Sequence, residues 1–178
     1  IMLIEELLLI ARIESGQVLL ECEPVALEET ARHVTAALEQ LAQAKDIRLA
    51  FDIDTPRPVV WGDAKKLHTV LHNLVDNAIK FTPNGGWVRG RICREGDQVV
   101  LEVADNGVGI PEESRDKIFD RFYRVHREGE VVPGTGLGLF IVREMVGLHR
   151  GRLAVESEPG KGSVFRVFLP AGDPANSP

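Results

Sequence analysis

The chain has 178 residues, a length that suits one compact domain with at most a short appendage. Its composition, 44% hydrophobic and 27% charged, is ordinary for a globular protein. A formal net charge of -6, with no basic run to offset it, argues against a nucleic-acid-binding surface. No stretch reaches the roughly 18–20 apolar residues that a membrane helix needs, because Glu5 and Glu6 interrupt the nearest candidate. The sequence start also lacks the features of a signal peptide.

The first apolar segment, residues 1–14, has hydrophobic side chains at helical spacing and ends at Ser15-Gly16. So short a helix is not stable alone in water, and we expect it to pack on a partner helix. Residues 17–23 then alternate like a strand, which Pro24 ends. The chain opens inside the helical pattern and without an initiator methionine, so we interpret it as a fragment of a longer protein.

The rest of the chain alternates between helical and extended patterns. We expect helices over residues 25–45, 63–81 (with Asp63 as N-cap) and 137–149. We expect strands over residues 47–53, 87–94, 98–104, 152–157 and 163–169. Together these elements predict a two-layer α/β sandwich.

Two segments have no regular pattern. Residues 105–133 form a long irregular stretch with one short helix expected near residues 114–119, and such a stretch inside a domain is typical of a functional lid. Residues 172–178 are rich in Pro, Gly and Ser, and we expect a disordered tail.

Three glycine-containing segments surround the expected lid, at residues 105–110, 134–139 and 160–162. Backbone N–H groups at a glycine-rich helix start can bind an anion such as phosphate. A P-loop is excluded because G-x-x-x-x-G-K-[ST] is absent, and a dinucleotide fingerprint because Leu139 stands where its third glycine belongs. A plain turn remains an alternative for Asp105-Asn106-Gly107.

The helix over residues 63–81 carries polar side chains on one face, because Asn73, Asn77 and Lys80 follow at i, i+4 and i+7. An amide oxygen is a hard ligand that suits Mg²⁺, an ion that takes few protein ligands beside phosphates and water. The alternative is a solvated helix face, with Lys80 favoured by the helix C-terminus.

Five motifs together resemble those of the ATP-binding catalytic domain of sensor histidine kinases. They stand in the family order and at the family spacing, and the resemblance covers residues 15–170. The motifs are the N box (Asn73 to Pro83), the G1 box (Asp105 to Pro111), the F box (Ile118 to Arg124), the G2 box (Gly134 to Leu139) and a closing glycine motif (Gly160 to Phe165).

The resemblance implies a role for each matching residue. Asp105 would accept a hydrogen bond from the adenine amino group, and Asn77 would hold Mg²⁺ against the triphosphate. Lys80 and Arg124 would neutralise phosphate charge, while Phe119 and Phe122 would anchor the lid in the core. The nucleotide-binding residues implied are Asn73, Asn77, Lys80, Phe81, Asp105, Gly107, Gly109, Ile110, Tyr123, Arg124, Gly134, Thr135, Gly136, Leu137, Gly138, Leu139 and Ser163.

The family fold is a mixed, largely antiparallel sheet covered by three helices, of the type shared with gyrase and heat-shock chaperones. The resemblance implies that residues 1–16 end a dimerisation helix hairpin, that residues 17–171 form the catalytic domain and that residues 172–178 are its tail. ATP and Mg²⁺ are the implied cofactors, and the γ-phosphoryl group would go to a histidine.

The acceptor histidine is not expected in this chain. In the family it is followed by an acid and, further on, by a proline, a pattern that none of the five histidines matches: His33, His68, His72, His126 and His149. The implied partners are the missing dimerisation domain, in a homodimer, and a response regulator. The implied location is the cytoplasmic part of a membrane-anchored sensor.

Three other functions stay open. The first is ATP hydrolysis, because related ATPases share the fold. Those ATPases carry a water-activating glutamate four residues before the metal-binding asparagine. This chain has Asn73 there, and a carboxamide is no general base at neutral pH. The fragment could instead be a nucleotide-binding or docking module without transfer activity. His68 and His72, at i and i+4, could bind zinc only with further ligands.

Overall fold

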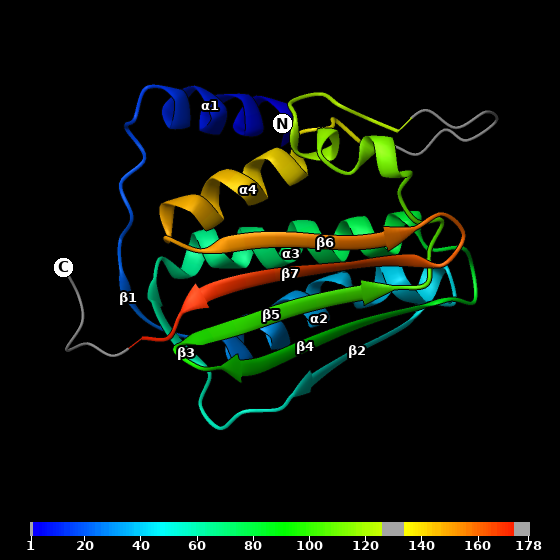
Figure 1. Cartoon of the computed structure of the whole chain (residues 1–178), viewed down its shortest axis with the longest axis horizontal. Helices are drawn as coiled ribbons and strands as arrows, with labels where there is room; N and C mark the ends of the chain where they lie inside the picture. The colour runs from blue at the N-terminus through cyan, green and yellow to red at the C-terminus, as the bar shows by residue number, and fades with distance from the viewer. Residues whose placement is uncertain (1, 126–133, 173–178) are drawn as a thin grey trace.

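The computed structural model describes residues 2–125 and 134–172, which fold into a sheet with helices packed behind it (Figure 1). The sheet has five strands in the order β2-β4-β5-β7-β6. Only β2 and β4 pair in parallel, and the other neighbours are antiparallel. The strands are β2 (Arg48–Ile53), β4 (Trp87–Glu95), β5 (Gln98–Asp105), β6 (Arg152–Glu158) and β7 (Gly162–Pro170). The predicted two-layer sandwich with a mixed, largely antiparallel sheet is therefore confirmed.

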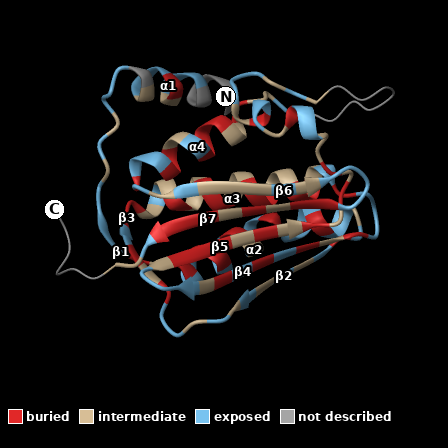
Figure 2. Cartoon of the chain, in the orientation of Figure 1, coloured by how far each residue is buried: buried red, intermediate tan, exposed pale blue. Residues whose placement is uncertain are grey.

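The strand register puts apolar side chains on one face of the sheet and charges on the other. Ile92, Leu101 and Val167 lie side by side on β4, β5 and β7, and all are buried beneath the helices (Figure 2). One residue away, Glu102 lies opposite Arg166, and these two form an ion pair of 2.6 Å on the outer face. Because side chains alternate with period 2, this alternation fixes which face the helices cover.

Three helices cover the apolar face: α2 (Leu27–Ala44), α3 (Ala64–Phe81) and α4 (Gly138–Leu148). On α2 the buried stripe ends at Ala42, whereas Leu41 is 40% exposed. The N-cap of α3 is Asp63, as predicted, since its Oδ1 accepts hydrogen bonds from the amides of Lys65 and Lys66, both at 3.1 Å.

The first helix, α1 (Met2–Glu14), lies over α4 in Figure 1. Ile10 is 6% exposed, while Leu7 and Leu8 are 42% and 56% exposed, so the contact uses only part of the apolar face. Ile13 at the end of α1 lines one groove together with Leu148 of α4. Among the described residues, none of the helices combines the length and the apolar character that crossing a bilayer requires.

The strand expected over residues 17–23 is wrong. The strand in this region is β1 (Glu23–Ala26), which contains Pro24 and pairs antiparallel with β3 (Val59–Gly62), a strand that the sequence did not predict. Proline lacks an N–H donor but is tolerated here because β1 has a partner on one side only.

The lid contains two 3₁₀ turns instead of one short helix, η1 (Glu112–Ser114) and η2 (Lys117–Phe119). Part of the expected lid, residues 126–133 with His126, lies outside the described residues. So does the expected disordered tail, apart from Gly172.

Candidate functional site

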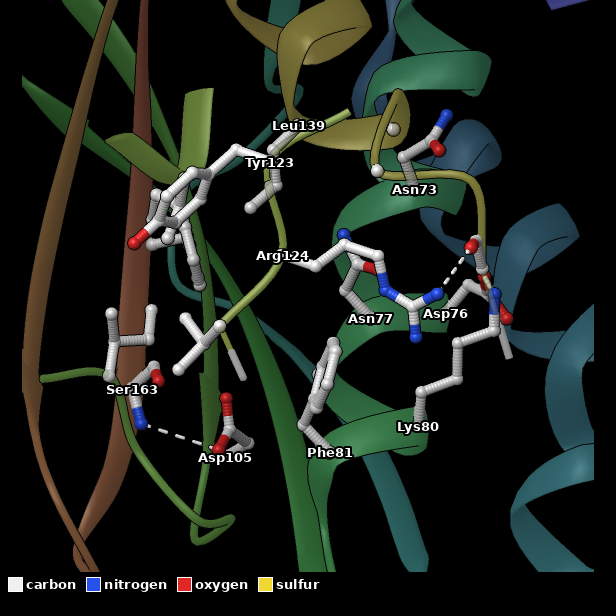
Figure 3. Close-up of a pocket in the computed structure, with 18 of the residues that line it drawn as sticks. Asn73, Asp76, Asn77, Lys80, Phe81, Asp105, Tyr123, Arg124, Leu139 and Ser163 are labelled. Atoms are coloured by element: carbon white, nitrogen blue, oxygen red, sulfur yellow. Dashed lines mark hydrogen bonds and ion pairs between the residues drawn. The ribbon is translucent and has the colours of Figure 1, made fainter. Parts of the chain in front are cut away.

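A cavity of about 300 Å³ lies between the inner face of α3, the start of α4 and the ends of β5 and β7 (Figure 3). Polar groups gather at its two ends, and apolar side chains form the walls between them. It is lined by His72, Asn73, Asp76, Asn77, Ala78, Lys80, Phe81, Asp105, Gly109, Ile110, Ile118, Tyr123, Arg124, Val125, Gly134, Thr135, Gly136, Gly138, Leu139, Ser163 and Phe165.

A single buried carboxylate, that of Asp105, marks one end of the cavity. The register of the sheet sets Asp105, the last residue of β5, opposite Ser163 on β7. Its Oδ1 accepts hydrogen bonds from the amides of Gly107 at 2.8 Å and Ser163 at 3.3 Å. The other carboxylate oxygen points toward the middle of the cavity (Figure 3). Burial raises the pKa of Asp105 to about 6, against the opposing effect of these two hydrogen bonds, so the group is mainly ionised at neutral pH.

The loop after Asp105 is fastened on both sides. The Val108 amide donates to the carbonyl of Phe81 at the end of α3, at 3.1 Å, and the Gly160 amide donates to the carbonyl of Val108, at 2.9 Å. Gly109 has a φ of +68°, and a Cβ built on it would lie 2.0 Å from the carbonyl oxygen of Glu158. Only glycine fits there, so the loop's path beside the cavity depends on it.

On the α3 wall, Asn73 meets the first turn of α4. The Asn73 Nδ2 donates to the carbonyl of Thr69 at 2.8 Å, which orients its Oδ1 toward α4. A Cβ on Gly138 would lie 2.6 Å from that Oδ1. The two helices therefore approach closely because Gly138 has no side chain.

Basic groups and helix amides gather at the other end of the cavity. The Lys80 ammonium pairs with the carboxylate of Asp76 at 2.5 Å, one helical turn earlier. The Arg124 guanidinium donates to the carbonyl of Gly134 at 3.1 Å. Helix α4 begins here, so its positive end is aimed at the cavity. These features suit a polyanion such as a chain of phosphates.

Lys45, the residue that directly follows α2, supports the α3 wall from behind. The Lys45 ammonium donates to the carbonyl oxygens of Ile79, Lys80 and Thr82 at 2.7, 3.0 and 2.6 Å. These carbonyls belong to the helix C-terminus, which lacks intrahelical donors and carries partial negative charge. Lys45 thus caps the turn that holds two cavity residues, Lys80 and Phe81. Partial burial lowers the pKa of Lys45.

Of the nucleotide-binding residues expected from the sequence, all but two line the cavity. Gly107 packs beneath it, where a Cβ would lie 2.5 Å from the carbonyl oxygen of Phe81. Leu137 is fully buried in the core. The expected core position of Phe122 is wrong: it is 59% exposed and has a φ of +61°, so its side chain leaves the core, whereas Phe119 packs against it.

Six cavity residues were not expected from the sequence. Asp76 could have been found from its spacing, since it is i+3 from Asn73 and i−4 from Lys80 on the same helix. The others are brought in by the fold and carry no local pattern: His72, Ala78, Ile118, Val125 and Phe165.

The donors beside the cavity fit a magnesium ion better than zinc. Asn77 and Asp76 offer oxygen atoms, and Mg²⁺ needs only one or two protein ligands when phosphates and water complete its shell. His68 and His72 stack with ring centroids 6.1 Å apart. Within residues 2–125 and 134–172, no group of three or more His, Cys, Asp or Glu residues could hold a metal ion.

Residues 62–173 match the protein family described as histidine kinase-, DNA gyrase B-, and HSP90-like ATPase. The chain therefore belongs to this family. Its similarity extends further to one branch: the sequence is 36% identical over 171 residues to the circadian input-output histidine kinase CikA of Synechococcus elongatus. That match covers 94% of this chain but 23% of CikA, so the chain spans under a quarter of the length of that relative.

Solved structures of histidine kinases have the same fold. The catalytic domain of ThkA is 31% identical with a TM-score of 0.75, over 85% of this chain and 96% of that one. Full-length ShkA in complex with AMPPNP is 30% identical with a TM-score of 0.83, over 97% of this chain and 36% of that one. A structure of ThkA with the response regulator protein TrrA matches at 28% identity and a TM-score of 0.76, over 98% and 49%. The chain is thus an ATP-binding catalytic domain of the sensor histidine kinase type.

Proposed function

We propose that the cavity binds Mg-ATP and that the whole protein transfers its γ-phosphoryl group to a histidine on a dimerisation domain, for relay to a response regulator. The observation that carries this proposal is the arrangement of charge in the cavity. A buried carboxylate, Asp105, lies at one end, and two basic groups, Lys80 and Arg124, lie with the start of α4 at the other.

At the base end, Asp105 reads the nucleobase. Its Oδ1 is held by Gly107 and Ser163, so the second oxygen is positioned to accept a hydrogen bond. The adenine amino group can donate that bond, whereas guanine has a carbonyl at the equivalent position and would leave a buried carboxylate facing an acceptor. The apolar walls from Ile110 and Phe165 suit a flat ring.

At the phosphate end, the protein has to position the triphosphate and neutralise its negative charge. Lys80, Arg124 and the amides of residues 134–138 would bind the β- and γ-phosphates, and Asn77 would hold Mg²⁺ against them. When bound there, magnesium would help to offset the charge that develops during transfer. Phosphoryl transfer needs little more than this from the protein.

Hydrolysis by water is disfavoured in this cavity. The residue at the place of an ATPase general base is Asn73, an amide whose Nδ2 already donates to the carbonyl of Thr69. A bound ATP would therefore persist until an acceptor histidine reaches it.

The remaining assignments follow from the same proposal. Residues 1–16 would be the end of the dimerisation hairpin, residues 17–171 the catalytic domain and residues 172–178 its tail. The full protein would be a homodimer that meets a response regulator, as the ThkA–TrrA complex illustrates for that kinase. The domain would work in the cytoplasm, where ATP is supplied.

The proposal is tested by titrating the chain with a non-hydrolysable ATP analogue in a calorimeter, with and without Mg²⁺, and with a GTP analogue for comparison. We expect the ATP analogue to bind in a magnesium-dependent manner and the GTP analogue not to bind. A histidine-bearing helical hairpin added with ATP should then become phosphorylated. Equal affinity for the two nucleotides would contradict the role of Asp105, and absence of phosphotransfer to any hairpin would favour a docking module.

A further inference from the structure

Asp76 and Lys80 form an ion pair inside the cavity rather than on the open helix surface. Their Oδ2 and Nζ atoms lie 2.5 Å apart, and their side chains are only 19% and 30% exposed. Both residues line the cavity, and Figure 3 shows them together beside Asn77 at the phosphate end. The lysine that is proposed to bind phosphate is therefore paired with a carboxylate of its own helix.

The Lys80 ammonium has three N–H donors, so it can bind a phosphate while it still contacts Asp76. In either case the Asp76 carboxylate lies near a polyanion, in a pocket where solvent screens charge less than at an open surface. A free triphosphate offers Asp76 only repulsion. A metal-bound triphosphate brings a cation with its own water molecules, which can donate hydrogen bonds to that carboxylate.

We propose that Asp76 makes the site select the metal-bound nucleotide over the free one. This rests on the proposed function and adds to it a specificity-determining residue. Asp76 offsets the charge that Lys80 presents to a phosphate, and only a metal–nucleotide complex compensates the nearby carboxylate. Its neighbour Asn77 is the residue proposed to hold the ion, so the two adjacent side chains act on the same metal complex, one directly and one through its water shell.

A structural salt bridge would have no such consequence. Pairs at i, i+4 are common on helices, and an exposed pair contributes little to stability. This pair differs from such surface pairs because it lies in the cavity. It also includes Lys80, the one lysine of α3 that lines the cavity.

The test compares Asp76→Asn with the wild-type chain by calorimetry, using a non-hydrolysable ATP analogue in Mg²⁺ and again in EDTA. Asn keeps the shape and removes the charge. We expect the affinity in EDTA to rise about fivefold and the ratio of the two affinities to fall accordingly. Adenosine, which has no phosphate, should bind wild type and variant equally, which verifies that the adenine end is intact.

Two further variants sharpen the result. Asp52→Asn removes the same charge from an exposed pair with Arg89 on the sheet, and its affinity ratio should equal that of the wild type. Lys80→Met should weaken the analogue both with and without metal. An unchanged ratio in Asp76→Asn would overturn the inference while leaving the proposed function in place. Undiminished binding by Lys80→Met would overturn the inference and would also contradict the phosphate-binding role of Lys80 in the proposed function. A wild-type chain that binds no adenine nucleotide would overturn both.

Discussion

The imidazole of His149 accepts a hydrogen bond at Nε2 from the backbone amide of Asp63, across 3.0 Å. Its Nδ1 donates to the carbonyl of Met145 at 2.7 Å, so the ring is neutral and buried, with 7% of its surface exposed. The Asp63 side chain in turn caps α3 and accepts a hydrogen bond from the amide of Glu21 in the segment that leads from α1. The end of α4, the start of α3 and the entry segment thus meet at one point.

This contact should make the domain sensitive to acid. Burial lowers the pKa of His149 in the folded chain, so below a pH of about 6.5 the unfolded chain binds a proton that the folded chain resists. The stabilising contribution is therefore present above that pH and lost as the pH falls through it. We expect the contribution of His149 to the free energy of unfolding in urea to fall between pH 7.5 and pH 5, as the difference between the wild type and a variant without this histidine.

The variant His149→Gln removes the titrating group and should flatten this part of the pH dependence, while costing about 1–3 kcal/mol at pH 7.5 through the disturbed hydrogen bonds. The exposed His33 supplies the control, since His33→Gln also replaces an imidazole but leaves the contact between His149 and Asp63 intact. If the wild type and both variants had equal pH profiles of unfolding free energy, His149 would not be the source of the acid sensitivity.

The cap that Lys45 places on α3 should be a major contribution to stability. Replacing Lys45 with Met keeps most of the aliphatic stem but leaves three carbonyls without their shared donor. We expect a loss of about 2–3 kcal/mol in urea unfolding, together with weaker nucleotide binding because Lys80 and Phe81 lie on the same turn. Lys65→Met, at a side chain that is 89% exposed, should cost almost nothing. A similar small cost at both positions would show that the cap is not stabilising.

The sequence predicted those features whose cause is local. The N-cap at Asp63 needs only a short polar side chain before a helix. The sheet class followed from alternating strands. Each of these was recovered because the determining interactions lie within a few residues.

The sequence-based predictions were wrong or incomplete where contacts with a segment distant in sequence determine the local structure. Residues 17–22 of the expected strand pair with no other described strand, whereas β1 begins at Glu23 because β3 is brought to it across the fold. Phe122 is apolar but is held at positive φ, with its amide bonded to the carbonyl of Gly136, and this turns its side chain outward. Likewise, nothing in the local pattern reveals that Lys45, just after the end of α2, caps α3.

Replacing either of two glycines of α4 with alanine should have opposite consequences, harmful at Gly138 and stabilising at Gly147. A Cβ at Gly138 would lie 2.6 Å from Oδ1 of Asn73, whose amide is held by Thr69, so Gly138→Ala should push α4 from α3 and weaken nucleotide binding roughly tenfold. A Cβ at Gly147 meets nothing within 4 Å, so Gly147→Ala should stabilise the domain by about 0.5–1 kcal/mol through helix propensity, with binding unchanged. Calorimetry and thermal unfolding measure the two effects. Unaltered binding by Gly138→Ala would mean that the Asn73 side chain yields without consequence.

Asp105 should strengthen nucleotide binding while lowering the stability of the folded domain. Its pKa rises from 3.8 in the unfolded chain to about 6 in the folded one, so the folded state binds the extra proton between these values. The contribution of Asp105 to stability therefore falls as the pH rises from about 4 to about 6, and by neutral pH the buried charge costs about 3 kcal/mol at most.

The variant Asp105→Asn should remove that cost, because its amide oxygen can still accept from the amides of Gly107 and Ser163. We expect a higher melting temperature at pH 8 and little change at pH 4, where the wild-type group is largely protonated in the folded state. The same variant should lose ATP-analogue binding, since an amide cannot match the carboxylate's charge toward the adenine amino group. Asp97→Asn, in the exposed turn between β4 and β5, is the control and should change neither property. A variant that is destabilised at pH 8 yet binds normally would contradict both halves of the argument: the carboxylate would then be a structural anchor for the loop and no reader of the base.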